Sequence, residues 1–136
     1  YAAAQLACEG SDRIASLFDG VGSFIVSPCE PERPVPLLAI TGDPDRHVVT
    51  RSVERWIEIN GCDPEPLFED LGSGIARKSY QGCEADVLFY DIEGLGHKVA
   101  MHECVGPVAD LYCEVYEELD QLDEAQRFFA GHPLPE

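Results

Sequence analysis

The chain has 136 residues, and its 26 acidic and 9 basic side chains give it a formal charge of −17 at pH 7. An apolar fraction of 45% excludes an intrinsically disordered protein. The acidic excess excludes a nucleic-acid binder, which needs a basic face. The sequence has no run of about 20 apolar residues and no polybasic patch, so it is not that of a membrane protein. The length predicts one domain, residues 1–136.

The chain opens with an Ala-rich segment, residues 1–9, which is typical of the C-terminal part of a helix that Gly10 would end. No charged segment precedes its apolar residues, so the start does not have the form of a signal peptide. A chain that opens inside a helix indicates a fragment or a processed product. A short N-terminal helix of a complete domain is the alternative interpretation.

Two strands and a helix are predicted in the first half of the chain. Residues 14–21 are mostly apolar, and residues 37–40 form a continuous apolar run that is typical of a strand buried on both faces. A Pro-rich extended loop, residues 27–36, connects them. The pattern then predicts a helix over 50–60, with apolar side chains on one face, and a Pro-rich acidic loop over 63–71.

The second half of the chain predicts a hairpin and a long helix. Residues 75–80 and 86–92 have the pattern of two strands joined by a turn, and a Gly-rich loop over 93–97 follows them. Apolar side chains then recur at spacings of three and four over 107–122. This spacing indicates an amphipathic helix, which we expect to continue until Gly131.

This order of elements favours an α/β fold with a mainly parallel sheet flanked by helices. Ligand sites in such sheets lie at the carboxyl ends of the strands. Two predicted loops at such ends carry titratable side chains. Asp43 and Asp45 follow the strand at 37–40, and His97 follows the strand at 86–92.

Asp45 and His97 have the chain order of the acid and the base in a nucleophilic triad. The carboxylate would hold the tautomer of the imidazole and stabilise the imidazolium, and the imidazole would take the proton of the nucleophile. The chain contains no Gly-x-Ser-x-Gly motif. Ser23 and Ser73 each follow a glycine but lack the full pattern. An ordinary loop aspartate and a hydrogen-bonded histidine are the alternative interpretation.

Six cysteines are spread over the chain without any C-x-x-C pair, so their spacing is not that of a zinc ribbon or a redox motif. Disulfides formed in an oxidising compartment are the favoured interpretation, and buried free thiols in a cytosolic protein are the alternative. The simplest of the possible pairings joins neighbours in the sequence: Cys8–Cys29, Cys62–Cys83 and Cys104–Cys113.

Several stretches, taken together and in order, resemble the C-terminal half of the secreted polyhydroxybutyrate depolymerase and feruloyl esterase group of α/β-hydrolases. The resemblance covers nearly the whole chain, and the ordered set is more specific than any single motif. The stretches are residues 6–9, 11–15, 33–42, Trp56 with 60–62, Tyr80 with 82–83, 87–94, 96–97 and 128–134.

The resemblance implies a partial α/β-hydrolase fold whose N-terminal half is absent, with Asp45 as the catalytic acid and His97 as the base. It also implies that the nucleophilic serine lies a few residues before Tyr1, so that the 136-residue chain by itself is inactive. The chain departs from the family at several positions, among them Thr41 and residues 48–50. These positions touch the expected cleft and leave the identity of the substrate open.

The expected function is that of a secreted serine esterase acting through an acyl-enzyme on carboxylic esters, either feruloyl or acetyl esters of polysaccharides or a polyester. The expected partner is that small-molecule or polymeric ester, without nucleic acid, membrane, metal or organic cofactor. A non-catalytic acidic extracellular binding module, or a degenerate hydrolase, is the alternative. A third interpretation is a metal site of His97, His102, Cys104 and Cys113, whose spacing matches no common zinc pattern. The sequence predicts no oligomeric state.

Overall fold

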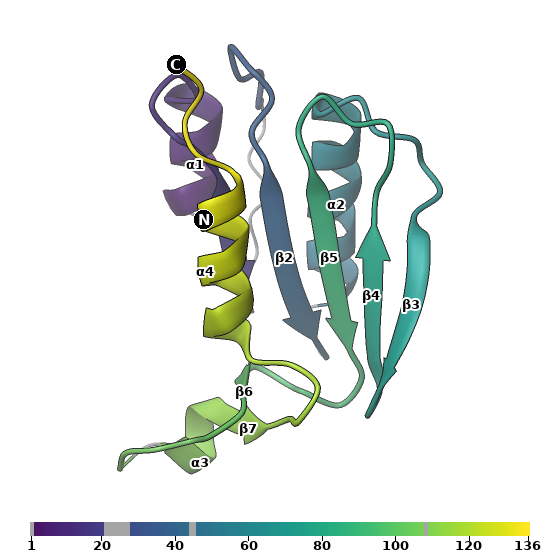
Figure 1. Cartoon of the computed structure of the whole chain (residues 1–136), viewed down its shortest axis with the longest axis vertical. Helices are drawn as coiled ribbons and strands as arrows, with labels where there is room; N and C mark the ends of the chain where they lie inside the picture. Colours follow the sequence, from purple (N-terminus) through teal and green to yellow (C-terminus); the bar gives the residue numbers. More distant parts are fainter. Residues whose placement is uncertain (1, 21–27, 44–45, 108) are drawn as a thin grey trace.

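The computed structural model describes residues 2–20, 28–43, 46–107 and 109–136 (Figure 1). Five strands form the main sheet in the order β1-β2-β5-β4-β3, and β6 and β7 form a second, two-stranded sheet. The elements in chain order are α1 (Ala2–Glu9), β1 (Leu17–Gly20), β2 (Leu37–Gly42), α2 (Arg46–Ile59), β3 (Leu67–Gly72), β4 (Ile75–Ser79), β5 (Val87–Ile92), β6 (Val99–Met101), α3 (Ala109–Tyr112), β7 (Cys113–Val115) and α4 (Gln121–Gly131).

The main sheet is mixed. β1 and β2 are parallel, as are β2 and β5, whereas β4 is antiparallel to both β5 and β3. The prediction of a mainly parallel sheet flanked by helices, and with it the prediction of a partial α/β-hydrolase fold, is therefore wrong. Much of the difference arises at residues 63–71, where most of the predicted acidic loop is replaced by β3, an antiparallel partner of β4.

β5 is the middle strand of the main sheet, and its parallel neighbour β2 lies between it and β1. All six residues of β2 are buried, which explains its continuous apolar run. Leu37, Ala39 and Phe89 pack with α1 and α2 on one face of the sheet, and Ile40 and Tyr90 pack with α4 on the other. In Figure 1, α2 accordingly lies behind the sheet and α4 in front of it.

Several predicted elements are confirmed with shifted ends. The helix expected over 50–60 is α2, which begins earlier, at Arg46, and buries Val53 and Trp56 on the face that packs on the sheet. Gly61, with a φ of 65°, follows its end in the left-handed conformation that glycine favours. The strands expected over 14–21, 37–40, 75–80 and 86–92 are β1, β2, β4 and β5, and β4 and β5 pair as the expected hairpin.

The long helix predicted over 107–122 is wrong. The described residues there form one helical turn, α3, followed by β7 and an irregular stretch before α4. A disulfide between Cys104 and Cys113 ties β7 to the residues after β6, and β6 and β7 pair in parallel. Tyr116 and Leu119, two of the periodic apolar residues, are buried without a helix. Figure 1 shows β6, α3 and β7 as a small lobe at the end to which the β2 and β5 arrows point.

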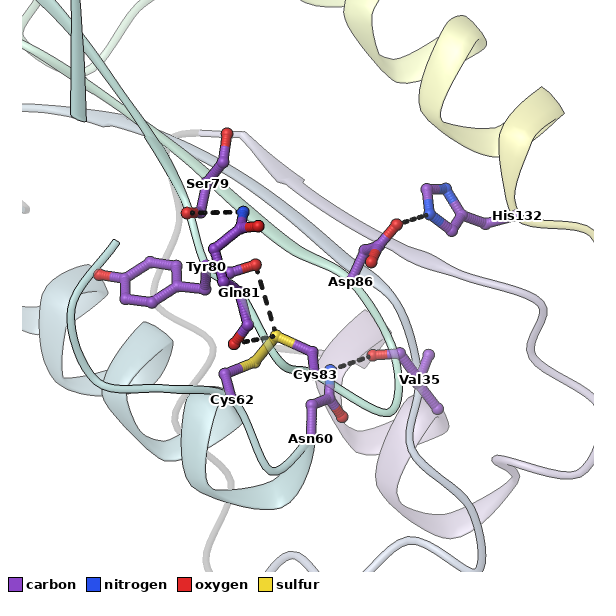
Figure 2. The surroundings of a disulfide bond; sticks show 9 residues. All are labelled: Val35, Asn60, Cys62, Ser79, Tyr80, Gln81, Cys83, Asp86 and His132. Atoms are coloured by element: carbon purple, nitrogen blue, oxygen red, sulfur yellow. Dashed lines mark hydrogen bonds and ion pairs between the residues drawn. A yellow bond between two sulfur atoms is a disulfide. The ribbon is translucent and has the colours of Figure 1, made fainter. Parts of the chain in front are cut away.

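The three predicted disulfides are confirmed: Cys8–Cys29, Cys62–Cys83 and Cys104–Cys113. The second bridge joins the end of α2 to the turn between β4 and β5, and beside it Asn60 donates from Nδ2 to the carbonyl oxygen of Val35 (Figure 2). Three disulfides are consistent with an extracellular protein. No helix in the described part of the chain is long and apolar enough to cross a membrane.

Candidate functional site

The candidate site lies at the end of the main sheet that is formed by the carboxyl ends of β2 and β5. These two strands are neighbours, run parallel and stay in register up to the pair of Gly42 and Ile92. Asp43 follows β2 directly, and His97 lies in the segment that follows β5. The two segments therefore start side by side at one edge of the sheet, as the sequence predicted.

The two segments are in direct contact. The backbone N–H of Gly94 donates to Oδ2 of Asp43 at 3.4 Å. Gly42 lies so close to the second segment that a Cβ added to it would be 2.6 Å from Cβ of Leu95 and 3.3 Å from the backbone nitrogen of Gly96. Leu95 is itself buried. Residues 42–43 and 94–96 therefore hold one another in place.

Arg46, the first residue of α2, forms charged contacts with two carboxylates at this end of the sheet. Its Nε donates to Oδ1 of Asp91 at 2.7 Å, and its Nη1 lies 3.4 Å from Oδ1 of Asp43. The hydrogen bond to Asp91 raises the pKa of Arg46 above its usual value. One guanidinium thus links a carboxylate of β5 to a carboxylate that follows β2. Sequence reasoning missed this link, because no motif marks it.

His97 is exposed at this edge, between β5 and β6. Gly94 and Gly96, which precede it, have φ values of 78° and 69°, so the tight path of the chain toward His97 depends on glycine at both positions. Asp45 and Ser23 lie outside the described residues. The expected contact between Asp45 and His97 therefore stays a prediction.

Ser73 lies at the same edge, because Ile75 at the start of β4 pairs with Ile92 at the end of β5. Ser73 and Gly74, with φ values of 53° and 77°, form a tight turn between β3 and β4. The Ser73 hydroxyl donates to Oε1 of Glu118 at 2.7 Å, and this bond lowers the pKa of Glu118. The turn joins two strands, whereas the elbow that presents a nucleophilic serine joins a strand to a helix.

One group of possible metal ligands occurs among the described residues, namely His102, Asp120 and Asp123, whose ligand atoms lie within 4.8 Å of one another. Asp120 already accepts bonds from the backbone N–H of His102 and from two N–H groups in the first turn of α4. Burial opposes its ionisation, but these bonds outweigh burial and lower the pKa of Asp120. Its carboxylate thus has a structural role. Cys104 and Cys113 form a disulfide and offer no thiolate to a metal.

A cavity of about 430 Å³ lies at the opposite end of the sheet from His97. Its lining includes Asp86, which precedes β5, and His132, which follows α4. Nε2 of His132 is 2.8 Å from Oδ2 of Asp86 (Figure 2). Its Nδ1 is 2.7 Å from the carbonyl oxygen of Phe128. The contact with Asp86 ties the end of α4 to the start of β5, and His97 is not among the described residues that line the cavity.

Comparison with known proteins assigns no family to the chain. No protein-family model matches it, and no curated protein matches it. The resemblance to depolymerases and feruloyl esterases therefore rests on the motifs of the sequence.

Proposed function

We propose that the protein is an extracellular serine esterase in which His97 acts as general base and then as general acid, oriented by Asp45. The observation that carries this proposal is the contact between residues 42–43 and 94–96, which locks together the two segments that lead to these side chains. A carboxylate and an imidazole work as a pair only when rigid elements hold them close together. The three disulfides support the extracellular location.

In the proposed reaction, His97 takes the proton of a serine hydroxyl while the serine oxygen bonds to the carbonyl carbon of the ester. The imidazolium, stabilised by Asp45, then gives this proton to the alcohol oxygen as the bond between that oxygen and the carbonyl carbon breaks. A water molecule then attacks the carbonyl carbon of the acyl-enzyme while His97 takes its proton. The proton passes to the serine oxygen as the bond between that oxygen and the carbonyl carbon breaks, and the acid is released. The substrate class, a carboxylic ester of a polysaccharide or a polyester, comes from the resemblance.

The nucleophile of this scheme is, as the resemblance implies, a serine that lies outside the 136-residue chain. Ser73 is a poor candidate, because its hydroxyl is bonded to Glu118 in a hairpin turn. We expect the 136-residue chain alone to be inactive, since its sequence lacks a nucleophile motif and the oxyanion donor that follows it.

Hydrolysis of p-nitrophenyl acetate by the natural gene product, combined with fluorophosphonate labelling and mass spectrometry, tests this function. We expect one serine to be labelled. The value of kcat/KM should fall by at least about 10³-fold in His97→Ala, because removal of a triad member disables the whole unit. His102→Ala is the matched control, since His102 is also exposed and lies only five residues away in the chain.

The control variant should keep its kcat/KM within about twofold of the unmodified protein. Unchanged hydrolysis in His97→Ala would overturn the assigned role of His97. A natural gene product that neither hydrolyses esters nor reacts with the fluorophosphonate would favour the non-catalytic binding module instead.

A further inference from the structure

Strand β3 is the outer strand of the main sheet, at the end opposite to β1 (Figure 1). Its inner side pairs with β4. No strand of the described part of the chain pairs with its outer side. An edge strand of this kind presents unpaired backbone N–H and C=O groups, which can bind a further strand.

Two large apolar side chains of β3 are exposed to solvent. Leu67 is 64% exposed and Phe68 is 65% exposed. Because the two residues are consecutive in a strand, their side chains lie on opposite faces of the sheet. A strand added beside β3 would therefore find an apolar contact on each face.

The same segment is strongly acidic. Asp63 and Glu65 precede the strand, and Glu69 and Asp70 lie within it, and all four are exposed. Among the described residues, Arg77 forms an ion pair with this group, because its Nη1 is 3.7 Å from Oε2 of Glu69. A second copy of this edge would bring like charges together, and each chain already carries a formal charge of −17. The charges thus oppose self-pairing and favour a basic partner.

The edge is held rigidly before any partner binds. The backbone N–H of Asp63 donates to the carbonyl oxygen of Gln81 at 2.8 Å, and the Cys62–Cys83 disulfide closes the base of the β3–β4 hairpin. Little conformational entropy would then be lost from this side on binding.

We propose that β3 is a docking edge for an extended basic segment of another protein, which adds to the main sheet as a further strand. Lys or Arg side chains of that segment would face Glu69 and Asp70, and its apolar side chains would cover Leu67 and Phe68. The acidic residues by themselves would protect an edge against aggregation, but protection does not account for two adjacent, exposed apolar side chains. This docking role is independent of the esterase function.

A fluorescent peptide with Lys and Val in consecutive pairs (Lys-Lys-Val-Val, repeated) is the probe, because it presents both residue types on each face of a strand. Fluorescence anisotropy at low and high salt is the measurement. We expect saturable binding that weakens with salt, because the contacts are partly ionic. A peptide of the same length with Glu in place of Lys should not bind. A Lys–Val peptide N-methylated at every backbone nitrogen should bind at least about tenfold more weakly, since neither of its edges can then donate hydrogen bonds to β3.

Two double variants locate the binding on β3. Leu67→Ser with Phe68→Ser should weaken binding at least about tenfold, and Glu65→Lys with Glu69→Lys should transfer the preference to the Glu peptide. The matched control is Leu111→Ser with Tyr112→Ser, because these side chains are also consecutive, apolar and about as exposed but lie in the lobe. The control should bind the Lys–Val peptide as the unmodified protein does.

An NMR titration of the unmodified protein makes the outcome independent of how the variants fold. Shifts confined to β3 and its neighbour β4 would support the docking edge. Equal binding of the Lys and Glu peptides, retention of binding in Leu67→Ser with Phe68→Ser, or shifts elsewhere on the molecule would overturn it. A concentration-dependent dimer formed through β3 would also overturn it, since the partner would then be a second copy.

Discussion

Strands β2 and β3 belong to one sheet and have six residues each, yet all of β2 is buried and five of the six residues of β3 are exposed. β2 lies between β1 and β5 with helices on both faces, whereas β3 contacts β4 alone within the sheet. The comparison shows that the position of a strand in the sheet determines which role the strand can have in the protein. The central strand positions the segment that carries Asp43, and the outer strand leaves its backbone and apolar side chains open to a partner.

The largest expected effect is on stability, to which β2 and β3 should contribute very differently. Ile40→Ala in β2 should lower the free energy of unfolding by about 2–5 kcal/mol, because Ile40 is fully buried and its truncation leaves a cavity. Leu67→Ala in β3 should change it by less than about 0.5 kcal/mol, because Leu67 is exposed. Urea unfolding monitored by circular dichroism measures both values. Similar losses in the two variants would contradict the comparison.

Removal of the Cys62–Cys83 bridge tests how β3 is held at the edge, because the loop that the bridge closes contains β3 and β4. Replacing both cysteines by serine should lower the free energy of unfolding by about 3 kcal/mol in the chain-entropy model. Hydrogen exchange should show the largest loss of protection in β3 and β4. An equal loss of protection in β2 would mean that the bridge stabilises the whole sheet rather than its edge.

Gly42→Ala probes the contact at the end of β2. The added Cβ would lie 2.6 Å from Cβ of Leu95, so the segment before His97 must shift, at a cost of about 1–3 kcal/mol. Gly131→Ala is the matched control, because a Cβ there meets no atom within 4 Å. We expect NMR shifts at Gly94 to His97 in the first variant only. Unmoved signals in that segment would show that the contact does not position His97.

The smallest effect concerns β1, the strand at the other edge of the sheet. Burial raises the pKa of Asp19 to about 6, and its Oδ2 is buried without a hydrogen-bond partner in the described part of the chain. The folded state therefore binds the proton of the Asp19 carboxyl group more tightly than the unfolded state does. Stability should fall as the pH rises from about 4 to about 6 and then stay level, so Asp19 costs stability at neutral pH.

Asp19→Asn removes this cost. It should raise the free energy of unfolding by about 1–2 kcal/mol at pH 8 relative to its effect at pH 4. Denaturant unfolding at the two pH values makes the comparison. If Asp19→Asn changed the free energy of unfolding by the same amount at pH 4 and pH 8, Asp19 would not titrate between these two pH values.

The predictability of the two regions differs for a physical reason. The apolar run at 37–40 has no alternative to burial, so β2 and its place in the sheet follow from the sequence. β3 was not predictable in the same way, because Pro64 and Pro66 precede it and its acidic side chains hide the strand pattern. An exposed edge strand buries neither face and so leaves no periodic signal.

The region after His97 was predicted wrongly for another reason. Apolar spacing over 107–122 indicates a helix, but the Cys104–Cys113 bridge and the pairing of β7 with β6 override this local preference. The candidate site was predictable in part. Strand order alone brings Asp43 and His97 to one edge, whereas the ion pairs of Arg46 depend on tertiary contacts that no motif marks.

The measurement that tests the central claim most directly is kcat/KM of the natural gene product for p-nitrophenyl acetate in Asp45→Asn, beside Asp43→Asn and Glu93→Gln. We expect Asp45→Asn to lower kcat/KM by about 10⁴-fold, because the imidazole loses the group that fixes its tautomer, and the other two to have much smaller effects. A loss in Asp43→Asn or Glu93→Gln that matches or exceeds that in Asp45→Asn would contradict the assignment of Asp45 as the acid.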